Sequence, residues 1–271
     1  MTTNSWNLTI QKMIWLVKHK INIKKFVEVT IEKDLNNETI GESAEASICL
    51  VTNIVCHINN NRINPIIVNR LIKTLKETNI LDELPSKIMS SDGYKNGSID
   101  FKLENGDTVS LKTLKYKDGK VCPQKVGQPT LNSWDKLWNQ SWNGQLEKNS
   151  ERWDFIKMNI HQYLNKMLQE VFCCDHLIII SDCIKNPKVT LYKAESLKDT
   201  INYFTNQDII YSRENYEERW NEKKHKYSEM SSTIKLNIND KEIKIGEFQF
   251  HKSSRQVLKF RFWDGFLQLL F

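Results

Sequence analysis

Hydrophobic and polar residues alternate along residues 98–112, on both sides of an Asn105-Gly106 pair. Alternation with a period of two predicts β-strands, and an Asn-Gly pair between two strands predicts a hairpin. Turns of two and of three residues both fit this pair, and they differ by one residue in strand register. The side chains that face each other therefore depend on the length of the turn.

The hydrophobic positions distinguish the two registers. In the three-residue register, one face carries Ile99, Phe101, Leu103, Val109 and Leu111, and the other carries Asp100, Lys102, Thr108, Ser110 and Lys112. The two-residue register mixes the two sets, so burial of one face favours the three-residue turn over residues 104–106. This turn requires Gly106 in the left-handed conformation. It places Asp100 opposite Ser110, with Lys112 diagonally beside Asp100.

The rest of the chain reads as a mixture of helices and strands. Hydrophobic residues at helical spacing predict helices at 6–21, 39–55, 66–78, 131–142 and 151–172, and a charged helix is expected at 216–230. The hydrophobic run at 177–180 predicts a central strand buried on both faces, with 188–193 beside it. Strands at 232–238, 242–249 and 257–262 predict a C-terminal meander. We expect one α/β domain over residues 1–271, with a mixed central sheet flanked by helices, an N-terminal helical region and an added C-terminal β-meander.

Composition narrows the function classes only slightly. The chain has 271 residues, 27% of them charged, and a formal net charge of +6, which permits a polyanionic partner without requiring one. It contains no Walker loop, GxGxxG, HExxH or GxSxG motif. The run at 177–180 is too short to span a bilayer, and the N-terminal residues lack a signal-peptide pattern, so we expect a cytoplasmic protein.

The pairing of Asp100 with Lys112 has a chemical interpretation. A carboxylate can hold a divalent metal, and the metal and the ammonium group can together stabilise charge on a phosphodiester and activate a water. The alternative is a solvated hairpin face with an ordinary cross-strand ion pair, which would contribute little.

Asp100, followed by Ser110-Leu111-Lys112 after a glycine-containing hairpin, resembles the motif of the PD-(D/E)XK nuclease superfamily and of its type II restriction endonucleases. Ile99 stands where the family name has proline, and Ser110 stands where the second acidic ligand usually lies. The resemblance implies a restriction-endonuclease-like fold and Mg²⁺-dependent hydrolysis of double-stranded DNA at a specific sequence. Asp100, Ser110 and Lys112 would form the catalytic motif. It also implies a restriction–modification role in the bacterial cytoplasm and the possibility of a homodimer.

A carboxylate from elsewhere could replace the acid missing at Ser110. Glu42 and Glu45 lie one turn apart in the predicted helix at 39–55, with Glu45 beside its hydrophobic stripe. The resemblance implies that such a helix presents a glutamate to the metal, with Glu45 preferred and Glu42 in reserve. The alternative is that both residues only complement the dipole of the first helical turn.

Two segments are suited to contacting DNA. The basic segment 115–130 and the alternating segment 246–262 could reach phosphates or base edges. The proposed contacts are Gln124, Lys125, Gln128, His251, Arg255, Lys259 and Arg261. A surface loop and an exposed sheet face, respectively, explain the same patterns.

Two further function classes remain open at this point. One is a catalytically inert DNA-binding protein with a nuclease-like fold, which the serine at position 110 keeps in view. The other is a non-specific or repair nuclease, for which the same catalytic groups would serve.

Overall fold

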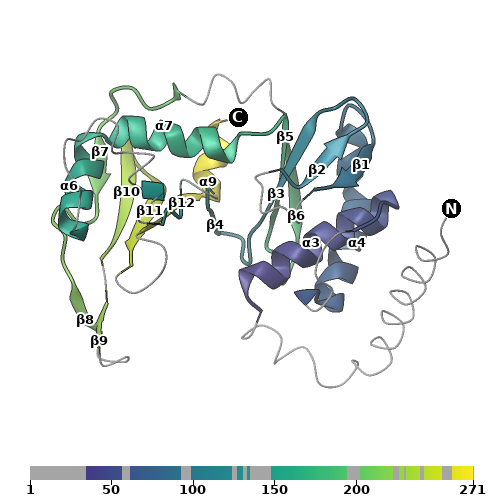
Figure 1. Ribbon diagram of the computed structural model, residues 1–271, viewed down its shortest axis with the longest axis horizontal. Coiled ribbons are helices and arrows are strands. Elements are labelled where there is room, and N and C mark those ends of the chain that lie inside the picture. Colours follow the sequence, from purple (N-terminus) through teal and green to yellow (C-terminus); the bar gives the residue numbers. More distant parts are fainter. Residues whose placement is uncertain are drawn as a thin grey trace.

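The computed structural model describes residues 35–56, 62–92, 99–123, 127–130, 133–134, 148–193, 202–221, 226–228, 230–238, 241–251 and 258–270. The predicted helix at 6–21 and nearly all of that at 131–142 lie outside these residues. Within them, the chain forms two five-stranded sheets with helices packed against them (Figure 1).

The first sheet, here called the N-terminal sheet, has the strand order β1-β2-β3-β5-β6. Its strands are β1 (Ile88–Ser91), β2 (Phe101–Leu103), β3 (Thr108–Thr113), β5 (His176–Ser181) and β6 (Lys188–Lys193). Strands β3 and β5 are parallel, and all other neighbours are antiparallel. The predicted mixed sheet is therefore present, with 188–193 beside the central strand.

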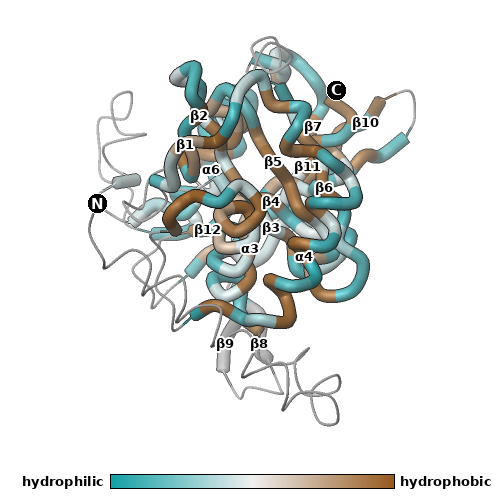
Figure 2. Tube along the Cα trace, turned by 90° about the vertical axis from the view of Figure 1, so that its right-hand side faces the viewer, coloured by the Kyte–Doolittle hydropathy of each residue, from teal (hydrophilic) through white to brown (hydrophobic). Residues whose placement is uncertain are grey.

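Strand β5 is buried along its whole length, as its continuous hydrophobic run predicts. Leu177 and Ile179 pack into the core that contains the C-terminal strands, whereas Ile178 and Ile180 pack into the core on the other side of the sheet. Successive side chains of a strand point to opposite faces, so a strand between two cores needs hydrophobic residues at every position. Figure 2 shows this strand as a hydrophobic segment in the middle of the molecule.

Helices α3 (Asn37–Thr52) and α4 (Pro65–Thr78) cover one face of the N-terminal sheet (Figure 1). An asparagine precedes each helix and caps its N-terminus. The side-chain oxygen of Asn36 accepts the Thr39 N–H at 2.7 Å, and that of Asn64 accepts the Ile66 N–H at 3.0 Å. The two predicted helices are thus confirmed. A short 3₁₀ helix, η2 (Ile80–Glu83), follows α4.

The hydrophobic core on the other side of the sheet also contains residues of α6 (Asn149–Met158), of α7 (Ile160–Val171) and of the C-terminal strands. The prediction of one helix over 151–172 is wrong, because the chain breaks at Asn159. The side-chain amide of Asn159 donates to the Phe155 carbonyl at 2.9 Å, in competition with the backbone ladder. Hydrophobic residues nevertheless keep helical spacing on both sides of the break.

The second sheet, here called the C-terminal sheet, is antiparallel with the order β4-β12-β11-β10-β7. Its strands are β4 (Lys120–Val121), β7 (Ile209–Tyr211), β10 (Ser231–Ile238), β11 (Lys241–Phe250) and β12 (Leu258–Trp263), followed by α9 (Asp264–Leu267) and η7 (Gln268–Leu270). The predicted meander is confirmed. The charged helix expected at 216–230 is wrong, since β8 (Arg219–Asn221) and β9 (Lys226–Ser228) pair there as a hairpin. That segment has no hydrophobic stripe to hold a helix against the core.

The segment after β3 joins the two sheets. Leu114 N donates to the Ile180 carbonyl at 2.8 Å, and a few residues later β4 pairs with β12. The predicted basic loop at 115–130 therefore contains a strand of the C-terminal sheet. This path carries the chain from the end of the hairpin straight to the C-terminal strands. Among the described residues, none of the helices is long and hydrophobic enough to cross a membrane.

Candidate active site

The hairpin at 99–113 has the register that its hydrophobic pattern predicts. Phe101 pairs with Val109 and Lys102 with Thr108, which leaves a three-residue turn in which Gly106 has a φ of 92°. Phe101 and Val109 are buried against α3 and α4, together with Leu103 and Leu111. Ile99 is an exception. It lies before β2 begins and packs against the core on the other side of the sheet, so its predicted place on the Phe101 face is wrong.

Asp100, Ser110 and Lys112 meet through hydrogen bonds. The Asp100 Oδ2 atom accepts the backbone N–H of Leu111 at 2.6 Å and the Ser110 hydroxyl at 3.3 Å. The Lys112 ammonium group donates to Ser110 Oγ at 3.0 Å. Ser110 thus connects the carboxylate and the lysine instead of supplying an acid of its own.

Burial separates this arrangement from a solvated ion pair. Asp100 is 5% exposed and Ser110 is 1% exposed. Burial raises the pKa of Asp100, while the Lys112 charge, the Leu111 N–H and the Ser110 hydroxyl act in the opposite direction. The hairpin therefore presents a desolvated carboxylate beside a cation, where electrostatic interactions are stronger than in water.

Glu45 reaches this site from α3. Burial raises its pKa to about 8, and the nearby Asp100 charge adds to the effect, whereas Lys112 lowers the pKa. Glu45 is therefore close enough to both hairpin residues to interact with their charges. Helix α3 packs directly on β3, since a Cβ placed on Gly41 would lie 3.8 Å from Thr113 Oγ1. A Cβ at this position would make only an ordinary van der Waals contact with Thr113.

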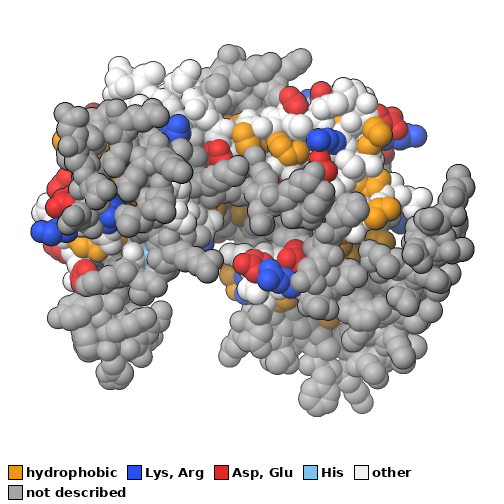
Figure 3. Space-filling model, viewed as in Figure 1, with side chains coloured by type: hydrophobic (Ala, Val, Ile, Leu, Met, Phe, Trp, Pro, Cys, Tyr) orange, Lys and Arg blue, Asp and Glu red, His pale blue; other side chains and the backbone are white. Residues whose placement is uncertain are grey.

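Glu42 has a different environment, one turn earlier in α3. It lies 3.5 Å from the Arg62 guanidinium group, and Arg62 also binds Glu38 at 3.0 Å. Burial raises the pKa of Glu42, and Arg62 opposes this shift. In Figure 3, acidic and basic side chains lie together over the end of α3 where these ion pairs form. The Glu42 carboxylate is thus already paired with an arginine, so Glu45 is the better candidate for a metal ligand.

The donor atoms of the site suit a hard divalent cation. Asp100 and Glu45 offer carboxylate oxygens, which are the ligands that Mg²⁺ prefers, and Mg²⁺ commonly keeps several waters beside one or two carboxylates. Among the described residues, no group of three histidine, cysteine, aspartate or glutamate side chains is arranged to hold a metal. Asp100 and Glu45 would therefore need water and substrate to complete the coordination of a metal.

The described DNA-contact candidates lie on or beside β12. Lys259 and Arg261 are on the strand, and His251 follows β11, which pairs with it. Burial lowers the pKa of His251, and the charges of Lys259 and Arg261 lower it further, so the three side chains are close together. Gln124, Lys125 and Arg255 lie outside the described residues.

The Cys122 thiol donates to the Phe260 carbonyl of β12 at 3.2 Å. Burial raises its pKa to about 11, opposed by Lys259, by a hydrogen bond from Gln128, and by Arg261 and Lys112. The same thiol is therefore near the hairpin lysine and near two cations of the C-terminal sheet. Gln128 is the described DNA-contact candidate that lies next to it.

Gly127 allows a close approach within the protein. Its carbonyl accepts the Phe260 N–H at 2.7 Å, and a Cβ on Gly127 would lie 2.3 Å from the Pro123 carbonyl oxygen. The close neighbours of Gly127 are Pro123 and β12 of the protein's own chain, so the glycine fixes the segment against the C-terminal sheet.

The sequence did not predict Lys120 and Glu247 of the C-terminal sheet as DNA contacts. With Gln249 they form a partly buried polar group on the face that carries Arg261. The Glu247 carboxylate is occupied by donors from its neighbours, which leaves it a poor candidate for a metal ligand. The signal available in the sequence was the matched alternation of 247, 249, 259 and 261 on neighbouring strands.

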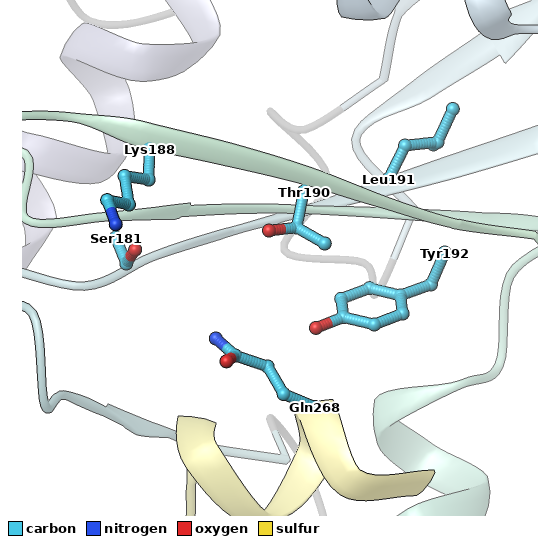
Figure 4. Close-up of a pocket in the computed structure, with 6 residues that line it drawn as sticks. All are labelled: Ser181, Lys188, Thr190, Leu191, Tyr192 and Gln268. Carbon is cyan, nitrogen blue, oxygen red and sulfur yellow. The ribbon is translucent and has the colours of Figure 1, made fainter. Parts of the chain in front are cut away.

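A cavity of about 450 Å³ lies between β6 and the C-terminal helical turns (Figure 4). It is lined by Ser181, Lys188, Thr190, Leu191, Tyr192 and Gln268. None of the predicted site residues lines it. Thr190 pairs with Ile179 and Ile179 with Lys112, so the cavity is two strands away from the hairpin site.

Comparison with known proteins identifies a relative of this chain. It is 31% identical over 243 residues to the type II restriction enzyme CviAII of Paramecium bursaria Chlorella virus 1, and the match covers 88% of this chain and 61% of that protein. The chain thus spans about three fifths of the length of the relative. No family model and no solved structure matches this chain. Because the relative is viral, a bacterial origin stays a prediction. The chain is homologous to a type II restriction enzyme.

Proposed function

We propose that this protein is a metal-dependent endonuclease of the PD-(D/E)XK superfamily that cuts double-stranded DNA at a specific sequence. The observation that carries the proposal is the buried Asp100-Ser110-Lys112 arrangement with the Glu45 carboxylate beside it. The homology to a restriction enzyme supports the same reaction class. A role in restriction and the possibility of a homodimer are parts of this proposal.

Each residue has a defined task in the proposed hydrolysis. Asp100 and Glu45 would hold Mg²⁺, which when bound polarises the phosphodiester and lowers the pKa of water. Lys112 is positioned by Ser110 and would orient the attacking water and stabilise charge on the phosphate. The oxygen of the water bonds to phosphorus, one P–O ester bond breaks, and the leaving oxygen takes up a proton.

Incubation of mixed plasmid or phage DNA with Mg²⁺ tests the proposal directly. Discrete fragments are expected, and ordered fragment ends would give the recognition sequence. Smeared DNA would favour a non-specific or repair nuclease. Binding without cutting would favour the inert DNA-binding protein. Ser110 supports that alternative, because it brings a hydroxyl group and not a carboxylate to Asp100.

Substitutions in the hairpin test the assigned roles. Asp100→Asn keeps an oxygen that can accept the Leu111 N–H, and it is expected to lose cleavage while it folds and binds DNA. Lys112→Met keeps the length of the side chain and is also expected to be inactive. Asp107→Asn is the matched control and is expected to keep activity. Asp107 lies in the same hairpin, but its partner is His176, at 3.0 Å. Full activity of either test variant, measured as single-turnover cleavage, would remove that residue from the site.

A further inference from the structure

Glu247 is a buried carboxylate in the middle of the C-terminal sheet. It lies on β11, is 6% exposed, and pairs across the strands with Thr233 on β10 and Arg261 on β12. Its neighbours in sequence, Gly246 and Phe248, face the other side of the strand, where aromatic side chains form the core. The carboxylate therefore belongs to the polar face and takes no part in the hydrophobic core.

Four side chains from four strands converge on this carboxylate. Oε1 accepts the Ser231 hydroxyl at 2.9 Å, lies 3.5 Å from Arg261 Nη2, and accepts the side-chain amide of Gln249. Oε2 accepts the Lys120 ammonium group. Lys120 also lies 4.2 Å from the centre of the Trp263 ring. One negative charge thus fixes two cations, and the group as a whole keeps a positive charge.

This arrangement immobilises side chains that are usually mobile. Arg261 and Lys120 are 23% and 20% exposed in their side chains, so each still reaches the surface. Long cationic side chains lose considerable rotamer freedom when a partner fixes them, and a ligand that meets them already fixed avoids that loss. A buried ion pair is by itself weak evidence for a contribution to stability. Placement of Arg261 and Gln249 is the better explanation of the network.

We propose that Glu247 is a positioning residue for sequence recognition, which holds Arg261 and Gln249 as a fixed pair that reads base edges of DNA. This inference rests on the proposed DNA-cleaving function. An arginine fork matches guanine and a glutamine amide matches adenine in the major groove, and both contacts depend on the orientation of a planar group. Gln249 and Arg261 become specificity-determining residues, and Lys120 completes the charge balance around Glu247.

The test compares Glu247→Gln with the parent protein after the target has been read from the ends of phage DNA fragments. Affinities for a duplex with the target and for a scrambled duplex are measured with Ca²⁺ in place of Mg²⁺, together with thermal unfolding. Glu247→Gln is expected to lose about 10–100-fold of the discrimination between the two duplexes. Affinity for the scrambled duplex should be kept or increased, because a negative charge is lost.

Glu242→Gln is the matched control on the same strand. Glu242 forms an exposed ion pair with Lys235 away from the network, and its substitution is expected to leave discrimination unchanged. Glu247→Asp is the second test variant, since it keeps the charge on a shorter side chain and should also lose discrimination. In an Arg261→Ala background, Glu247→Gln should remove little further discrimination, because a residue that acts through Arg261 has nothing left to position.

Two results would overturn the inference separately from the proposed function. If the parent discriminates and both Glu247 variants discriminate equally well, Glu247 has no positioning role. If Glu247→Gln lowers discrimination by the same factor with and without Arg261, it does not act through that residue. A parent protein that neither binds nor cuts DNA would instead overturn the proposed function and the role of Glu247 with it.

Discussion

At the scale of single residues, Glu45 stands out in the candidate site because its pKa is raised far above its ordinary value. Burial raises its pKa from 4.5 to about 8, and the charge of Asp100 raises it in the same direction. Between these two pH values, the folded metal-free protein holds a proton that the unfolded chain has released. Stability is therefore expected to fall as pH rises from about 4.5 to about 8 and to level off above that range.

Glu45→Gln tests this expectation, because an amide does not titrate in this range. In the presence of EDTA, the free energy of unfolding of the parent should fall by roughly 3.5 kcal/mol more than that of the variant between pH 5 and pH 8. Urea unfolding at several pH values measures the difference. Glu77→Gln, on the exposed face of α4, is the control. Parallel curves for the parent and Glu45→Gln would show that Glu45 does not carry a raised pKa. The same variant should also lose Mg²⁺-dependent cleavage.

At the scale of elements, Gly246 permits the close packing of β11 against β12. The register between β10 and β11 shifts between Ile234 and Lys235, opposite Gly246. A Cβ on Gly246 would lie 2.6 Å from Phe260 Cζ and 2.8 Å from the Arg261 carbonyl oxygen. Gly246→Ala is therefore expected to destabilise the protein by about 1–3 kcal/mol. Thermal unfolding measures the loss, with Gly265→Ala as a control, since a Cβ there meets nothing within 4 Å. Equal melting temperatures for Gly246→Ala and the parent would contradict the steric argument.

How much of the structure the sequence predicts also depends on the element. The hairpin register and the buried strand β5 were predictable, because alternating or continuous hydrophobic residues determine which faces are buried. The break at Asn159 and the hairpin of β8 and β9 were not, since one depends on a side-chain hydrogen bond and the other on strand pairing without a hydrophobic pattern. In the candidate site, the placement of Asp100 and Lys112 on either side of Ser110 followed from local register. The alternation of 247, 249, 259 and 261 indicates a shared polar face. It does not predict that Lys120 and Ser231 bind Glu247, because these residues are far from Glu247 in the sequence.

At the scale of the whole molecule, the two sheets bring different parts of the proposed function together. The hairpin of the N-terminal sheet carries the candidate catalytic groups, and β12 of the C-terminal sheet carries the basic residues. The Cys122 thiol interacts with Lys112 from the first and with Lys259 and Arg261 from the second. A DNA duplex that contacts β12 would therefore lie near the hairpin, which is what recognition coupled to cleavage requires.

The position of Lys259 gives a prediction about the whole binding surface. If Lys259 contacts a phosphate, Lys259→Ala should weaken binding to target and scrambled duplexes alike, and the slope of log affinity against log salt should become shallower by about 0.9. Lys73→Ala removes the same net charge from α4, which packs on the face of the N-terminal sheet opposite the C-terminal strands. It is expected to leave the slope nearly unchanged. Fluorescence anisotropy at several salt concentrations measures both variants. Equal slopes for Lys259→Ala and Lys73→Ala would show that affinity follows overall charge, and that β12 does not face the DNA backbone.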